Sequence, residues 1–296
     1  METLPTKILP SVFSLLKESF KIYKKYFWGL TGISVFLILS AIFYFPSQIL
    51  ALNCVYQVIA ILGDILFTTI ILLVLICAIK IYISSEQKVK RIICWKKGIS
   101  LILPFLWIII LSFLVLTGSF NLLIVPGLII SIYLILTPYT LVFEGQKGLN
   151  SLLRSFQLIR GNWWGVLWRI LCLTLCLILC LIFLTLLIYF IFNNKIILSL
   201  LGEASLKFLN SIITVITIII FFLIAPPLIL PLILIYEYLI FDALAKQKPL
   251  ETFNPQKNRK LFIVLVIWGL LNIIVLLVTL FQFYFKEKHF FFPNLF

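Results

Sequence analysis

The side chains that most often carry out chemistry in enzymes are scarce in this chain. Its 296 residues include 10 aspartates and glutamates, 6 cysteines and a single histidine, His289. No two cysteines form a Cys-x-x-Cys pair, and metal-assisted hydrolysis needs carboxylates and histidines close together. The sequence therefore predicts no catalytic, metal-binding or cofactor-binding site, and it favours a protein that is not an enzyme.

Four ionisable residues fall inside long apolar segments or at their ends and are candidate intramembrane polar residues: Asp64, Arg169, Glu237 and Asp242. Charged side chains are costly in hydrocarbon, so they usually face a bundle interior or an aqueous cavity. Arg169 and Glu237 are at similar depth in consecutive segments, and we expect them either to form an ion pair or to extend separately to the headgroups. Asp64 either binds a cation or proton in an outward cavity or marks the outer interface.

The composition identifies the environment of these residues. Hydrophobic residues make up 63% of the chain and charged residues 11%, whereas soluble domains have about 45–50% and about 25%. Apolar runs such as residues 212–224 lack the alternation that β-barrel strands require. The sequence therefore predicts an all-α, multi-pass membrane protein whose core is a helical bundle.

We expect six core transmembrane helices and one additional helix near the C-terminus. The predicted crossings are, approximately, residues 27–45, 62–83, 99–123, 128–143, 163–192, 208–245 and 261–284. The sixth is predicted to be one long helix kinked at Pro226-Pro227 and Pro231, because proline removes a backbone donor. Pro126-Gly127 is predicted to form the turn between the third and fourth crossings.

Three amphipathic helices are predicted at the cytoplasmic interface, over residues 11–27, 88–97 and 149–160. In the first, apolar residues recur at helical spacing opposite a row of lysines, which we expect to meet anionic lipid. These apolar residues are Val12, Phe13, Leu16, Phe20, Tyr23 and Phe27. In the third helix, Arg154 is predicted to point away from the apolar face, and Gly161 to permit the bend into the next crossing.

The positions of the basic residues predict the topology. Of the 24 lysines and arginines, 20 fall in residues 1–26, 80–99, 147–169 and 246–260. Because cytoplasmic loops carry the excess of positive charge, we expect a cytoplasmic-membrane protein with its N-terminus inside and its C-terminus outside. Orientation and attraction to anionic headgroups explain the basic surface, so nucleic acid is not an expected partner.

The predicted organisation is a membrane domain over residues 1–247, a basic cytoplasmic loop over 248–260, the additional helix over 261–284 and a short tail over 285–296. Within the first of these, residues 19–29 resemble residues 155–165, with Ser-Phe at the start and Trp-Gly at the end. Weaker similarities suggest three repeats, each an interfacial helix followed by two crossings. The alternative is chance similarity between segments rich in leucine and isoleucine.

One group of residues has the spacing of a known motif: Pro126, Gly127, Glu144, Gly145, Ser155, Gly161, Trp163 and Trp164. This pattern resembles the membrane domain of the glycerophosphodiester phosphodiesterase family and related uncharacterised bacterial six-helix proteins. The resemblance covers about residues 10–247 and implies a six-helix membrane domain. Some members of that family carry a soluble phosphodiesterase domain after the membrane part, whereas here a basic loop and one more crossing follow. Phosphodiesterase activity is therefore not implied.

Two functions remain as hypotheses. The first is a non-catalytic membrane module that interacts with membrane lipids, through anionic headgroups at the cytoplasmic face, or with a membrane or cytoplasmic protein partner. The alternative is a secondary transporter. Transport would require a polar cavity within the membrane, and Asp64, Arg169 or Glu237 would be expected to line it.

Overall fold

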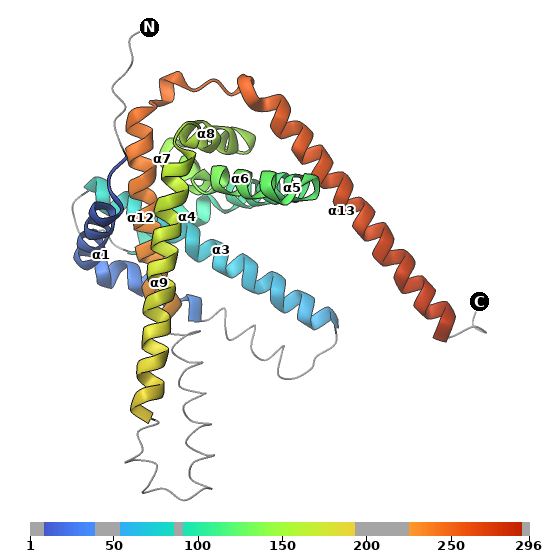
Figure 1. The fold of residues 1–296 in the computed structure, drawn as a ribbon, viewed down its shortest axis with the longest axis horizontal. Helices are drawn as coiled ribbons and strands as arrows, with labels where there is room; N and C mark the ends of the chain where they lie inside the picture. Colours follow the sequence, from blue (N-terminus) through green and yellow to red (C-terminus); the bar gives the residue numbers. More distant parts are fainter. Residues whose placement is uncertain (1–8, 39–53, 86–90, 193–224, 292–296) are drawn as a thin grey trace, which may run out of the picture. The chain divides into compact units, whose positions relative to one another are not determined.

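The computed structural model describes residues 9–38, 54–85, 91–192 and 225–291, and their regular secondary structure is helical (Figure 1). The elements are α1 (Val12–Ser34), α3 (Cys54–Ser85), α4 (Arg91–Ser100), α5 (Ile102–Leu122), α6 (Ile124–Leu134), α7 (Thr137–Glu144), α8 (Leu149–Ile159), α9 (Trp163–Phe192), α12 (Ala225–Gln247), the 3-10 turn η2 (Leu250–Thr252) and α13 (Gln256–Phe291).

Six segments of the described residues are long and apolar enough to cross a bilayer. They are Ile61–Ser84, Ile102–Leu122, Ile124–Glu144, Trp163–Leu187, Ala225–Gln247 and Asn258–Thr279. Each exceeds the roughly 20 residues that a crossing needs. The chain is therefore an all-α integral membrane protein with several transmembrane helices, which confirms the predicted fold class.

Two of the predicted crossings lie partly outside the described residues. The first, residues 27–45, is described only as far as Ile38, and the sixth, residues 208–245, only from Ala225. From that point α12 is long enough to cross a membrane by itself. Pro226 and Pro227 stand in its first turn, where a missing N–H costs no hydrogen bond. A single kinked helix over 208–245 therefore stays a prediction.

The chain divides into two compact units. The first contains residues 1–102 and 164–247, and the second contains residues 103–163 and 248–296. In the first unit, α1 packs against α12 and α3, and α4 packs against α3. In the second unit, α8 packs against α6 and α7, and α13 also contacts α8.

Helix α1 changes direction at Tyr26, whose backbone is non-helical (φ −114°, ψ 18°). The Tyr26 ring stacks on Tyr82 of α3 with 4.9 Å between centroids. At Gly29, a Cβ atom would lie 2.5 Å from the Tyr82 hydroxyl oxygen, so any larger residue there would displace the Tyr82 ring. Beyond this kink α1 runs along α12, and the Ser34 hydroxyl donates to the Pro227 carbonyl at 2.5 Å. The kink falls next to Phe27, where the sequence predicts that the first crossing begins.

The predicted turn at Pro126-Gly127 is wrong, because both residues lie inside α6. The chain turns instead at Leu123, which has an extended backbone and precedes α6. Proline is well suited to a first helical turn because its missing donor is not needed there. Glycine at 127 permits close packing: a Cβ atom there would lie 2.4 Å from the Phe120 ring of α5.

The fourth crossing consists of two helices, since the chain breaks between α6 and α7 near Leu136. Gly145 ends α7 in the left-handed conformation (φ 73°), and Gly148 (φ 55°) precedes α8. The predicted amphipathic helix is confirmed as α8. Gly161, with φ 89°, lies at the predicted bend between α8 and α9.

Candidate functional site

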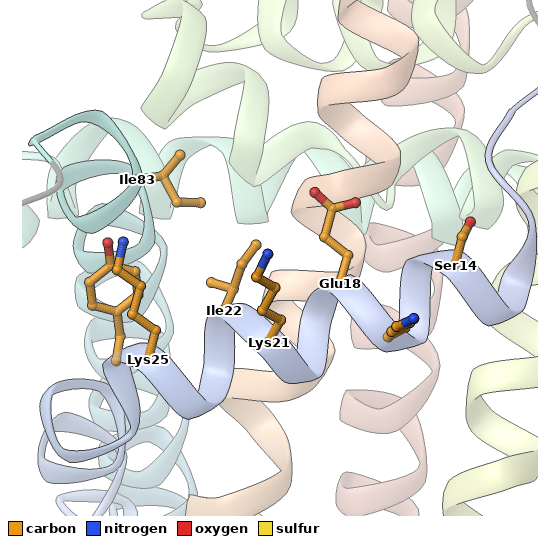
Figure 2. Close-up of a pocket in the computed structure, with 8 residues that line it drawn as sticks. Ser14, Glu18, Lys21, Ile22, Lys25 and Ile83 are labelled. Carbon is orange, nitrogen blue, oxygen red and sulfur yellow. The ribbon is translucent and has the colours of Figure 1, made fainter.

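A groove of about 450 Å³ follows one side of α1 in the first unit (Figure 2). Figure 2 shows Glu18, Lys21 and Lys25 extending from α1 on the side toward Ile83, which belongs to the last turns of α3. We call this feature the α1 groove. Its lining residues are Ser14, Lys17, Glu18, Lys21, Ile22, Lys25, Tyr26 and Ile83.

The α1 groove is positively charged. Lys17, Lys21 and Lys25 recur every four residues and therefore share one helix face, and Glu18 is the one acidic residue among the lining residues. All four side chains are exposed, and none forms an ion pair within the described part of the chain. The Lys25 ammonium lies 5.1 Å from the centroid of the Tyr26 ring, within cation–π range. The groove thus presents cations that form no ion pair with any residue that the structure describes.

The apolar face predicted for this helix is divided in the structure. Leu15 and Ser19 are the residues that bury into the first unit, at 1% and 0% exposed. Phe13 and Phe20 remain 78% and 60% exposed, so they do not pack into the unit as a single apolar face would. Trp28 is also 79% exposed. Helix α1 therefore combines a buried side, an uncovered aromatic side and the basic groove.

Arg169, in the second turn of α9, ties that helix to the start of α1. Its Nε donates to the Pro10 carbonyl at 2.8 Å, its Nη2 to the Leu9 carbonyl at 2.7 Å and its Nη1 to the Gly165 carbonyl at 2.7 Å. Among the residues that the structure describes, these carbonyls are its partners, and the predicted ion pair with Glu237 is not formed. Backbone carbonyls near α1 satisfy this guanidinium instead.

The carboxyl-terminal end of α12 also lies beside α1. Glu18 of α1 and Asp242 of α12 both act electrostatically on Tyr238. Asp242 pairs with Lys246 one turn later at 2.5 Å. Three helix ends thus lie next to α1. Ile83 marks the end of α3, Arg169 the start of α9, and Asp242 the end of α12. These are the helix ends that the charge pattern predicts to be cytoplasmic, and the orientation stays a prediction.

The remaining candidate residues lie elsewhere. Asp64 is half-buried on α3, and Glu237 is half-buried on α12, where it interacts with other groups. Neither lines the α1 groove. The described residues contain no group of three or more histidine, cysteine or acidic side chains able to hold a metal ion. A transport cavity lined by Asp64, Arg169 or Glu237 stays a prediction.

The second unit contains a buried ion pair between Glu144 and Arg154. Arg154 is 0% exposed. Its Nε and Nη2 donate to the two Glu144 carboxylate oxygens, each at 2.8 Å, and Nη2 also donates to the Lys248 carbonyl at 2.7 Å. Arg154, predicted to point away from the apolar face of the helix, is therefore buried in this ion pair instead of lying on an exposed polar face. A bidentate carboxylate and a carbonyl replace the water that the guanidinium loses on burial.

Lys248 completes this cluster by capping α8. Its Nζ donates to the carbonyls of Gln157 at 2.9 Å, Leu158 at 3.0 Å and Arg160. The last carbonyls of a helix lack partners within the helix, and a cation there also interacts favourably with the helix dipole. Burial and the nearby charges of Arg154 and Arg160 lower the pKa of Lys248. We call these residues the Glu144–Arg154–Lys248 network.

Other residues of the recognised motif also hold α8 and its continuation in place. The Ser155 hydroxyl donates to the Tyr133 carbonyl of α6 at 2.6 Å. The Trp163 indole donates to the Ile129 carbonyl, also of α6, at 3.3 Å. Trp164 is 75% exposed. Ser155 and Trp163 thus fasten α8 and the first residue of α9 to the fourth crossing.

No family model, no curated protein and no solved structure matches this chain. The resemblance to the glycerophosphodiester phosphodiesterase membrane domain thus depends on the motif residues alone and stays a prediction.

Proposed function

We propose that this integral membrane protein is a non-catalytic module of the cytoplasmic membrane, and that its α1 groove binds the phosphate of anionic lipid headgroups. The observation that supports this function is the row of exposed lysines at 17, 21 and 25, which have no ion-pair partner among the described residues. Each lysine near an anionic membrane surface strengthens the affinity for lipid by a factor of about ten or less.

The surroundings of the groove suit a membrane surface. Phe13, Phe20 and Trp28 are exposed on the same helix, and aromatic rings are favoured at the boundary between headgroups and hydrocarbon. Lysine is a compact cation on a flexible stem, which suits a mobile phosphate. The aromatic residues would therefore hold α1 at the depth where its lysines reach the headgroups.

The test is lipid binding by the purified full chain. We expect the chain in phosphatidylcholine nanodiscs to retain added phosphatidylglycerol, counted by native mass spectrometry. The triple substitution Lys17→Gln, Lys21→Gln, Lys25→Gln should weaken this retention about tenfold or more. High salt should weaken the wild-type interaction as well, because the groove is exposed to solvent.

The matched control removes three exposed lysines that do not line the groove, Lys96, Lys147 and Lys260. It has the same net charge as the groove variant, and we expect it to retain phosphatidylglycerol almost as the wild type does. Equal losses in both triple variants would show that net charge alone attracts the lipid, and the proposed site would be rejected.

The proposed orientation has its own test. In a variant without native cysteines, new cysteines at Lys17 and Gly148 should both react with a membrane-impermeant reagent from the cytoplasmic side. Reaction of the two positions from opposite sides would contradict the topology and, with it, a cytoplasmic headgroup site.

A further inference from the structure

A second groove, of about 380 Å³, lies between α5 and the α6–α7 pair in the second unit. We call it the α5–α7 groove. Apolar side chains dominate its lining, among them Phe105, Ile108, Phe113, Leu116 and Leu134, with Thr137 at the start of α7. Its walls belong to two membrane-spanning segments, so the bilayer is the source of whatever fills it. Its size falls within the range of about 300–1,000 Å³ typical of ligand pockets.

Thr137 differs from several other threonines of the transmembrane helices. It is 1% exposed, and its hydroxyl has no hydrogen-bond partner within the described part of the chain. A threonine in a helix ordinarily donates to the carbonyl four residues earlier. Within the described helices, Thr117, Thr174, Thr185 and Thr279 do so, at 2.8 to 2.9 Å.

The break between α6 and α7 explains why Thr137 is left without an acceptor. The carbonyl four residues earlier is that of Tyr133, which precedes the break and accepts from the Ser155 hydroxyl at 2.6 Å. The Thr137 carbonyl accepts from the Thr140 and Ser151 hydroxyls, at 2.8 and 2.9 Å. The hydroxyls of Thr140, Ser151 and Ser155 are thus paired, while that of Thr137 lacks an acceptor among the described residues. A buried unpaired hydroxyl is unfavourable, so this position favours a ligand that supplies an acceptor.

We propose that the α5–α7 groove binds one acyl chain of a diacyl glycerophospholipid and that the Thr137 hydroxyl donates a hydrogen bond to the ester carbonyl of that chain. This site differs from the α1 groove in its position and in the part of the lipid that it recognises. An ester carbonyl is the acceptor that a phospholipid brings closest to its hydrocarbon chains.

The depth of Thr137 suits an ester. Thr137 precedes Glu144, at the end of α7, by seven residues, which corresponds to about 10 Å along a helix. The polar layer on each side of the hydrocarbon is about 5–8 Å thick. If Glu144 lies among the headgroups, Thr137 is therefore near the level at which the ester groups begin.

Thr137 lines the groove, and its hydroxyl is buried. Rotation about the Cα–Cβ bond moves the hydroxyl to another staggered position, and threonine readily adopts two such rotamers in a helix. The hydroxyl can thereby turn toward an ester carbonyl without movement of the backbone.

The experiment compares two forms of phosphatidylcholine that have the same chains but are joined by ester or by ether bonds. Both are electrically neutral overall, so their binding does not depend on the α1 groove. We expect the full chain to retain the ester form about fivefold better in native mass spectrometry, the factor that one ordinary hydrogen bond supplies. An ester lipid with a photoreactive acyl chain should crosslink to peptides within residues 102–144.

Substitutions test whether Thr137 causes the preference for ester over ether lipid. Thr137→Val should abolish this preference. The variant should fold at least as stably as the wild type, because valine has the shape of threonine without the unpaired hydroxyl. Thr137→Ser should keep the preference. The matched control Thr117→Val should also keep it, because the Thr117 hydroxyl already donates to Phe113 within α5. Ser131 of α6 also lines the groove. Ser131→Leu fills the groove and should lower crosslinking.

Equal retention of ester and ether lipids by the wild type would overturn the hydrogen bond to Thr137. Crosslinks confined to residues outside 102–144 would overturn occupation of the groove. Neither result would affect the headgroup proposal, which is tested with charged lipid and with different residues.

Discussion

The α1 groove and the Glu144–Arg154–Lys248 network are both built from basic side chains near the ends of membrane helices, but they use the charges differently. In the network, Arg154 is 0% exposed and donates to Glu144 and to a carbonyl. In the groove, three lysines are exposed and form no ion pair with the described residues. The comparison teaches that a basic residue must be judged by its partners: the paired cations hold the fold, and the unpaired cations are available for a ligand.

The comparison predicts effects on stability of very different size when a cation is removed from each region. Arg154→Met leaves the Glu144 carboxylate, 12% exposed in its side chain, without its partner. We expect it to lower the free energy of unfolding by about 3–5 kcal/mol, as for other buried pairs that lose one member. Lys21→Met in the α1 groove should change it by less than about 0.5 kcal/mol. Unfolding in mixed micelles with a denaturing detergent measures both.

A double variant separates loss of the pair from loss of packing. Glu144→Gln with Arg154→Met removes both charges, so it should be more stable than Arg154→Met alone. A double variant as unstable as the single one would show that the ion pair is not the reason for the loss.

The next effect concerns the cap on α8. Lys248→Met should lower the free energy of unfolding by about 1–2 kcal/mol, since it leaves three carbonyls of the α8 end without their donor. The lowered pKa of Lys248 in the folded protein also makes stability depend on pH. Between this lowered pKa and the ordinary lysine value of about 10.5, the unfolded chain binds more protons than the folded one. The stability contribution of Lys248 therefore rises as pH increases through that window.

The measurement is the free energy of unfolding at several alkaline pH values for the wild type and for Lys248→Met. The difference between the two proteins should grow as pH rises toward about 10.5. A constant difference would contradict the lowered pKa, and no difference at neutral pH would contradict the cap.

The fold was predictable from sequence where a repeated pattern determines it. The spacing of apolar residues predicts a helix over residues 149–160, observed as α8 (Leu149–Ile159), and glycine at 161 predicts the bend that follows. The burial of Arg154 was not predictable in this way, because a hydrophobic pattern counts arginine as polar. Its partner Glu144 lies ten residues earlier, and the pair forms only through the positive-φ turn at Gly145 and Gly148.

The candidate site was only partly predictable for a related reason. The lysine row of α1 follows directly from the four-residue spacing. Arg169, however, binds the carbonyls of Leu9 and Pro10, and no sequence pattern shows where a non-helical segment offers its carbonyls. The missing acceptor of Thr137 likewise depends on the break near Leu136. The sequence Pro126-Gly127 is compatible with a turn and with the start of a helix. Proline suits a first helical turn, and glycine at 127 permits close packing on Phe120.

The smallest expected effect tests the charge balance within the α1 groove. Glu18 lies among the three lysines without an ion pair to any described residue, so its carboxylate repels an incoming phosphate. We expect Glu18→Gln to strengthen retention of phosphatidylglycerol about two- to threefold, because removal of one exposed charge in high dielectric changes binding only modestly. Glu251→Gln, at an exposed position outside the groove, should have almost no effect. Native mass spectrometry at low and moderate salt measures the gain, which should shrink as salt screens the charges. Weaker retention by Glu18→Gln would mean that this carboxylate positions the lysines, and the groove would then belong with the paired charges of the network.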